Sequence, residues 1–270
     1  MRKIKNAILK IWKIMRQPEM LILPGNLAFF LVLSLVPIIS LFGIIASILS
    51  LSTDTFINLV YDFFPSSIVD IVIPFIDGSN LSANSIIFTF IGFFLASNGP
   101  DSLIVASNLI YKKENKGYIY RRIKASIMTF LMLILFVFIL LVLAFGNIIL
   151  NWLSDFNTIG TFIHNSFEFI VALKFLVAFS FIFIFIKLLY TIAPDASIKS
   201  RKVNVGAFFA TLSIMLVTAF YSYYVTNIAR YDIIYGNLSN IIISIFFVYI
   251  ISYIIVLGIA INAHGIKEDK

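Results

Sequence analysis

The chain has 270 residues, of which 61% are hydrophobic and 12% are charged, and its mean hydropathy is +1.03. Soluble domains are about half apolar and about one-quarter charged, so this composition excludes an ordinary soluble domain and is typical of an integral membrane protein. The chain contains no cysteine, which excludes disulfides and cysteine-based sites, and the meaning of its +7 net charge depends on where the basic residues lie.

Residues 1–20 are predicted to form an amphipathic helix on the cytoplasmic surface of the membrane. Its apolar residues recur at helical spacing, and most of its Lys and Arg residues lie elsewhere around the helix. This pattern suits an anionic membrane surface, although a plain cytoplasmic lead-in is compatible with the same residues. We do not expect a secretory signal peptide, because the apolar residues alternate with Lys and Arg and no small-residue cleavage site follows.

Six apolar segments follow, and a membrane-spanning helix needs about 20 mostly apolar residues. The predicted spans cover about 27–50, 85–111, 125–150, 167–190, 203–228 and 238–263. With both termini in the cytoplasm, all Lys and Arg residues except Lys174 and Arg230 fall on one side of the membrane, as the positive-inside rule requires. The sequence therefore predicts an all-α, polytopic protein that forms one integral membrane domain over residues 1–270.

Residues 51–84 form a long connection on the outer side of the membrane. They contain no Lys or Arg but four aspartates, and Pro65 and Pro74 interrupt them. Their apolar residues cluster with a helical period around the aspartates. We expect one or two short amphipathic helices that lie on the outer face or dip into it.

The first span contains a proline in its interior. Pro37 removes a backbone hydrogen bond, and Ser34, three residues earlier, can bond a carbonyl that is left free. We expect a tolerated kink here in preference to a moving hinge.

The second span is interrupted by polar residues, in the stretch ASNGPDSLIVASNLIY. We expect the interruption at Asn98, Gly99, Pro100 and Asp101, with Asp101 or Ser102 capping the helix that follows. Asn108 lies seven residues after Asp101, and so on the same helix face. This polar stripe is the candidate site, because broken helices build substrate sites in transporters. The alternative is that the span ends at Ser97 and that the next helix lies flat on the cytoplasmic surface.

Lys174 is a further candidate for this polar membrane site, about seven residues into the fourth span. A lysine at this depth can extend its amine to the membrane surface. Alternatively it pairs with Asp101, the only carboxylate expected at depth.

Several short motifs follow one another along the chain, and their residues are Ala28, Ser34, Pro37, Ser107, Asn108, Tyr111, Tyr190, Pro194, Gly206, Ala207, Tyr235, Gly236, Leu257 and Gly258. In their order and spacing these motifs resemble those of the YihY/BrkB family of bacterial inner-membrane proteins. The resemblance implies six spans and residence in the bacterial plasma membrane. The family commonly has a glutamate shortly after its closing glycine, whereas this chain continues from Gly258 as Ile-Ala-Ile-Asn-Ala. The family carries a virulence label and an older ribonuclease label.

The residues do not favour an enzyme. The cytoplasmic acids are scattered, and His164 and His264 are too few for an imidazole metal site, so we expect no metal and no cofactor. Orientation and contact with anionic head groups on the cytoplasmic face explain the basic clusters, so we expect membrane lipids and no nucleic acid as partners. A transporter or amphiphile-handling protein is the favoured function. A membrane scaffold or envelope-integrity protein without transport activity is the alternative.

Overall fold

The computed structural model describes residues 9, 11–48, 83–134, 167–227 and 237–268 of the chain. Over these residues every regular element is a helix and there is no strand, so the all-α prediction is confirmed for this part of the chain. The named elements are α2 (Pro18–Ile48), α5 (Ala83–Ala96), α6 (Asn98–Tyr111), α9 (Phe167–Ile192), η1 (Ser200–Val203), α10 (Asn204–Asn227) and α11 (Asn237–Glu268). Residues 11–15 and 118–134 are also helical.

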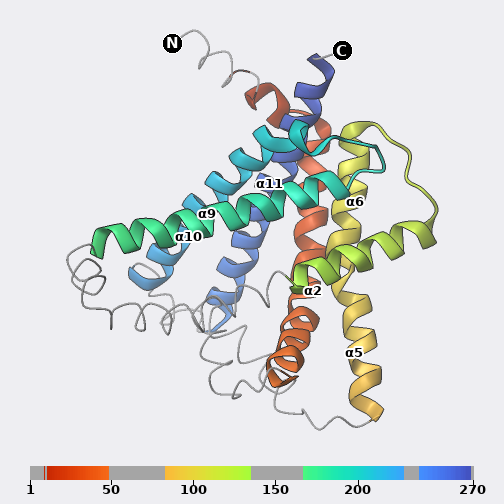
Figure 1. Cartoon of the computed structure of the whole chain (residues 1–270), viewed down its shortest axis with the longest axis vertical. Helices are drawn as coiled ribbons and strands as arrows, with labels where there is room; N and C mark the ends of the chain where they lie inside the picture. Colours follow the sequence, from red (N-terminus) through yellow and green to blue (C-terminus); the bar gives the residue numbers. More distant parts are fainter. Residues whose placement is uncertain (1–8, 10, 49–82, 135–166, 228–236, 269–270) are drawn as a thin grey trace, which may run out of the picture.

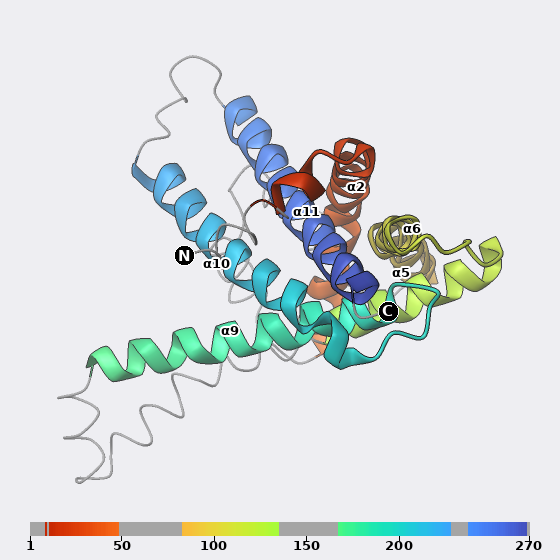
Figure 2. The ribbon, with the colours of Figure 1, turned by 90° about the horizontal axis from the view of Figure 1, so that it is seen from above.

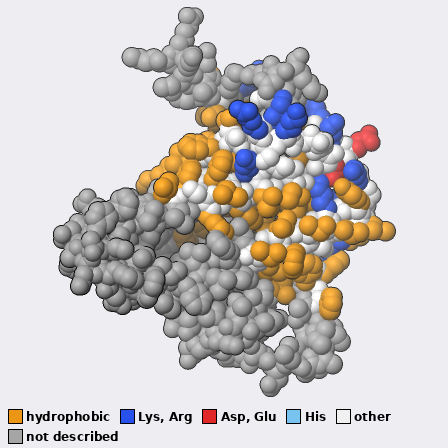
Figure 3. Space-filling view, in the orientation of Figure 1, with side chains coloured by type: hydrophobic (Ala, Val, Ile, Leu, Met, Phe, Trp, Pro, Cys, Tyr) orange, Lys and Arg blue, Asp and Glu red, His pale blue; other side chains and the backbone are white. Residues whose placement is uncertain are grey.

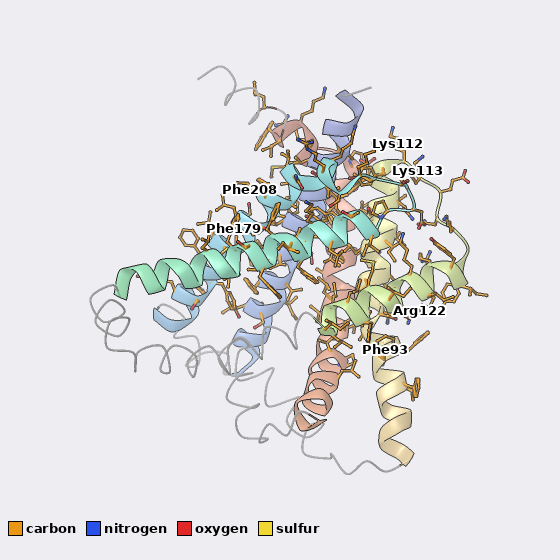
Figure 4. All side chains as sticks on the ribbon, in the orientation of Figure 1. Phe93, Lys112, Lys113, Arg122, Phe179 and Phe208 are labelled. Carbon is orange, nitrogen blue, oxygen red and sulfur yellow. The ribbon has the colours of Figure 1, made fainter. Side chains whose placement is uncertain are left out.

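The helices pack around α2 and α11, which lie side by side (Figures 1 and 2). On its other side α2 contacts α5 and α6, which follow one another along it, and α11 also contacts α10. Helix α9 packs against α10 and crosses it, and the ring of Phe179 lies edge-on to that of Phe208, with 5.5 Å between the centroids (Figure 4). The described helices therefore form one connected bundle.

Apolar side chains fill the interior of this bundle and also cover much of its surface. The largest buried side chains include those of Leu27, Ile104, Tyr190 and Ile259. Orange apolar side chains form a broad band across the visible face in Figure 3, while most of the blue Lys and Arg side chains lie above that band. We call the end of the bundle with these basic residues the basic end. Within the described residues, two stretches, Ser200–Tyr224 and Ile242–Gly265, are long and apolar enough to cross a membrane by length and composition.

The beginning and the end of the described chain lie together at the basic end. Nε2 of Gln17, just before α2, lies 3.2 Å from Nε2 of His264 in the last turns of α11. In the short helix over residues 11–15, Trp12 is exposed and Ile14 is buried, so the segment has one apolar face toward the bundle and another on the surface. The predicted outer segment 51–84 lies outside the described residues except for its last two, which begin α5.

Helix α2 continues through both of its prolines, Pro24 and Pro37. The Ser34 hydroxyl donates to the carbonyl of Phe30, one turn earlier, at 2.6 Å. It also lies 3.4 Å from the carbonyl of Leu95 in α5. Ser34, three residues before Pro37, is fully buried, and its hydroxyl forms a polar contact between α2 and α5.

Candidate functional site

The polar interruption of the second predicted span is a single residue. Ser97 separates α5 from α6, and the hydrogen-bond ladder continues across it, from Ser97 N to Phe93 O at 3.1 Å and from Asp101 N to Ser97 O at 3.0 Å. Ser97 is the N-cap residue of α6, and its side chain makes no cap hydrogen bond. The prediction that Asp101 or Ser102 caps this helix is wrong. Proline is tolerated in the first turn, where its missing N–H is not needed, so the helix begins before Pro100.

Helix α6 packs closely on α2 through small and polar residues. Gly99 and Pro100 are buried, and a Cβ on Gly99 would lie 3.0 Å from the side chain of Leu31. The Ser102 hydroxyl donates to Oδ1 of Asn26 at 2.9 Å. Gly99, which has no side chain, thus allows the backbone of α6 to approach α2, and the hydrogen bond between Ser102 and Asn26 joins the two helices.

Two of the predicted site residues bind arginines of the helical segment 118–134. Nη1 of Arg122 donates to Oδ1 of Asn98 at 2.8 Å, and Nε of Arg121 forms an ion pair with Asp101 at 2.7 Å. The Arg122 guanidinium also donates to the carbonyl of Phe94 and lies 3.7 Å from the centroid of its ring. Figure 4 shows Arg122 where this segment crosses α5 and α6, next to Phe93. The two arginines therefore hold the segment across the α5–α6 junction.

Asn108, the third polar residue of the predicted stripe, is completely buried at the other end of α6. Its Nδ2 donates to Oδ1 of Asn115 at 2.8 Å and to Oδ2 of Asp195 at 2.7 Å. Its Oδ1 accepts the backbone N–H of Asp195, also at 2.7 Å. One amide thus bonds both the side chain and the backbone of Asp195 and joins α6 to the connection after α9.

Asp195 is also the acid of a buried ion pair with Lys124. Nζ of Lys124 lies 2.6 Å from Oδ1 of Asp195, and their side chains are 13% and 1% exposed. Nζ also donates to the carbonyls of Ala193, at 2.8 Å, and Pro194, at 3.1 Å. Burial would raise the pKa of Asp195, but the hydrogen bonds from Lys124, Asn108 and the backbone of Lys116 outweigh burial, and the pKa lies below its ordinary value. The carboxylate is therefore charged at neutral pH.

Lys174 is the partner that the sequence predicts for Asp101. Lys174 belongs to α9, but its side chain lies outside the described residues, so the Lys174–Asp101 pair stays a prediction. The partner that the structure shows for Asp101 is Arg121.

A second polar contact lies where α9, α10 and α11 meet, and it contains several of the motif residues. The Tyr190 hydroxyl donates to the carbonyl of Ile255 at 2.7 Å, and Oδ1 of Asn262 accepts the backbone N–H of Gly206 at 2.7 Å. Gly258 lies against Tyr190 on one side and Gly206 on the other. Pro194 is buried next to Asp195, while Tyr235 and Gly236 lie outside the described residues.

Several residues of these contacts were not among the predicted site residues, including Lys124, Asp195, Asn115, Asn262, Arg121 and Arg122. Asp195 carried a usable signal, because it is the only acid in the basic stretch 187–202. In the part of the chain that the structure describes, no group of three or more His, Cys, Asp and Glu residues could hold a metal ion. The site offers amides, guanidinium groups and two ion pairs, which bind and position polar groups.

A family model described as "Virulence factor BrkB" matches residues 11–269. The chain is similar to "Putative ribonuclease-like protein YfkH" of Bacillus subtilis (strain 168), with 29% identity over 250 residues, covering 91% of this chain and 90% of that protein. A UPF0761 membrane protein of Alteromonas mediterranea is 37% identical over 70 residues, covering 26% of this chain and 24% of that protein. No solved structure matches the chain.

Proposed function

The chain belongs to the virulence factor BrkB family and is a membrane protein, and from this premise we propose that it transports or presents an amphiphile at the bacterial plasma membrane. The proposal includes six membrane spans with both termini in the cytoplasm. One observation carries it, the Lys124–Asp195 ion pair that is bonded to Asn108 and lies just outside the proposed spans.

The distribution of charge supports the proposed orientation. Most of the Lys and Arg side chains on the visible face lie at the basic end, above an apolar band (Figure 3). Cytoplasmic loops of membrane proteins collect such residues, so the basic end is the cytoplasmic one. The contact between Gln17 and His264 agrees with this orientation, because it places both ends of the described chain on the same side.

The buried ion pair supports a working role over a purely stabilising one. Removing two charges from water costs several kcal/mol per ion, and apolar residues of similar size often stabilise a fold equally well. The two residues of the pair lie just outside the proposed spans 125–150 and 167–190, where they can meet the polar end of an amphiphile at the membrane surface. Here Lys124, Asp195 and Asn108 join three separate elements. If segment 118–134 moves away from α6, these polar groups become available to the polar end of an amphiphile.

The alternative function, a membrane scaffold, is favoured by a different observation. Asn98, Asp101 and Asn108 each have a partner within the protein, namely Arg122, Arg121 and Asp195. Polar residues that are satisfied in this way can fix the packing of helices without any transport.

Cysteine accessibility separates the two functions, because the chain contains no native cysteine. Single cysteines replace Asn98, Asp101 and Asn108 in the full-length protein in membranes, and an aqueous maleimide is added from the cytoplasmic side. Transport predicts labelling at all three positions, and a scaffold predicts protection. Lys116→Cys, at an exposed site, gives the upper limit of labelling, and Ala106→Cys, at a buried site next to Asn108, gives the lower limit.

Reconstitution into vesicles tests the activity directly. We expect the protein to accelerate the exchange of a fluorescent phospholipid between leaflets, and Asp195→Asn to reduce that rate at least tenfold. A wild-type rate equal to that of protein-free vesicles would reject transport.

We propose no ribonuclease activity for this chain, despite the name of the Bacillus relative. The two acids of the site are engaged by cations, Asp101 by Arg121 and Asp195 by Lys124, which leaves neither carboxylate free as a general base. Purified protein that degrades RNA, with Asp195→Asn abolishing the degradation, would overturn this conclusion.

A further inference from the structure

A cleft of about 440 Å³ lies between the helical segment 118–134 and the connection that follows α9. Its lining includes the polar residues Lys116, Lys124, Asp195 and Ser197 and two isoleucines of the segment, Ile123 and Ile127. The charged residues of its lining are two lysines and one aspartate, so the cleft carries a net positive charge.

The two lysines of the cleft differ in whether their ammonium groups still have N–H donors for a ligand. Nζ of Lys124 donates to two carbonyls and to Asp195, so its three N–H groups are already used. Nζ of Lys116 lies 4.4 Å from the centroid of the Tyr120 ring, and among the described residues it has no ion-pair partner. Lys116 is therefore the cation that can meet an anion in the cleft, and Lys124 fixes the wall behind it.

Two isoleucines of the cleft lining belong to an exposed apolar stripe. Ile123 and Ile127 line the cleft, although they are 57% and 54% exposed. Ile119, Phe130 and Ile134 continue the stripe, and spacings of three and four residues place all five side chains on one face of the helix. In a membrane protein such a face contacts lipid chains, so the cleft leads from a lysine amine to hydrocarbon.

We infer that this cleft binds one anionic phospholipid of the cytoplasmic leaflet, with the phosphate at Lys116 and an acyl chain along the isoleucine stripe. Charge complementarity favours this occupant, because a basic residue near the cytoplasmic surface attracts anionic lipid and the apolar wall requires a ligand with a hydrocarbon part. The inference rests on the proposed function for its orientation, and it names the head-group class of the amphiphile.

Lipid retention in nanodiscs tests the inference with the full-length protein. The discs contain phosphatidylglycerol and phosphatidylcholine in equal amounts, and mass spectrometry measures which lipid stays bound after transfer to detergent. Lys116→Gln removes the cation, and Ala196→Phe fills the cleft without a change of charge, since Ala196 also lines it. The matched control is Lys113→Gln, which makes the same charge change three residues away, at a lysine that does not line the cleft.

We expect the wild type and Lys113→Gln to retain phosphatidylglycerol preferentially. Lys116→Gln should lose about fivefold of that preference, the order that one lysine contributes near an anionic surface. Ala196→Phe should lose it as well. Equal retention of the two lipids by the wild type, or an equal loss in Lys113→Gln and Lys116→Gln, would overturn the inference.

Two further measurements assign the source of the phosphate and separate the inference from the proposed function. Excess glycerol phosphate in the buffer should not displace the lipid, and complete displacement would assign the cleft to a soluble phosphate compound instead. Failure of wild-type protein to move lipid between leaflets would reject the transport proposal. In that case a preference that depends on Lys116 would still support the lipid site.

Discussion

The phenolic oxygen of Tyr190 occupies the place where a side chain on residue 258 would begin. The same oxygen donates to the carbonyl of Ile255, one turn earlier in α11, at 2.7 Å. Gly258 therefore leaves the space that a buried tyrosine of α9 needs to reach the α11 backbone. On its other side the Gly258 carbonyl lies against Gly206 of α10, so three helices meet at this position.

This relationship predicts a coupling between the two residues. Gly258→Ala should lower the free energy of unfolding by about 1–3 kcal/mol, because the new methyl group overlaps the Tyr190 hydroxyl. Tyr190→Phe alone should cost about 1 kcal/mol through the lost hydrogen bond. The double variant should be less destabilised than the sum, since the overlapping atom is gone. Denaturation in mixed micelles measures the cycle, and strictly additive effects would contradict it.

A second prediction concerns the contact between α10 and α11. A Cβ on Gly206 would overlap the Gly258 carbonyl and lie 2.6 Å from the side-chain amide of Asn262. The Gly258 carbonyl and the Asn262 side chain both belong to the packed helix α11, so Gly206→Ala should destabilise the protein by about 2 kcal/mol. The matched control is Gly25→Ala in α2, where nothing lies within 4 Å of the new methyl group. Thermal unfolding in detergent should show a lower midpoint only for Gly206→Ala.

A third prediction follows from the buried carboxylate. Asp195→Asn leaves Lys124 buried without its counter-ion and should cost about 3 kcal/mol at neutral pH. Because the pKa of Asp195 is lower in the folded protein than its ordinary value, the stabilisation is complete above the ordinary range of aspartate. It is lost as the pH falls below about 4 and through the folded pKa.

The measurement is the difference in unfolding free energy between the wild type and Asp195→Asn as a function of pH. This difference should be constant from pH 8 to about pH 5 and should shrink in more acidic solution. Glu19→Gln, at an exposed acid, is the control and should give a small difference throughout. A difference that grows on acidification would show that Asp195 is not stabilised as a carboxylate.

A fourth prediction tests the partner of Asp101. Reversing one charge, by Asp101→Arg or Arg121→Asp, should reduce the amount of folded protein in the membrane, because two like charges then face each other. The double reversal should recover more than half of the loss. If the double variant is no better than the single ones, while Lys174→Asp combined with Asp101→Lys restores folding, then Lys174 is the functional partner.

The sequence predicted the helices well because helices in a membrane protein need long apolar runs, and such runs are visible along the chain. Helix α10 (Asn204–Asn227) and the predicted span 203–228 differ by only one residue at each end. The start of α6 was predicted four residues late, because proline was read as a helix breaker. In the first turn of a helix Pro100 has no hydrogen bond to lose, and the helix begins with Asn98.

The polar stripe of Asn98, Asp101 and Asn108 could be predicted from helical spacing, but its partners could not. The positive-inside rule already explains why Arg121 and Arg122 are basic, so nothing in the sequence pairs them with Asp101 and Asn98. Asp195 lies 87 residues after Asn108, and no local pattern reports a contact at that separation. Such pairs are decided by the packing of α6, the helical segment 118–134 and the connection after α9.

The separation between Asn108 and Asp195 also has a consequence for the order of assembly. Chains are synthesised at about 5–20 residues per second, so Asp195 leaves the ribosome roughly 4–17 seconds after Asn108. During that interval Asn115 is the only one of the two side-chain partners of Asn108 that has been made. Until Asp195 is made, the amide of Asn108 therefore lacks the carboxylate and the backbone N–H that it bonds in the folded protein.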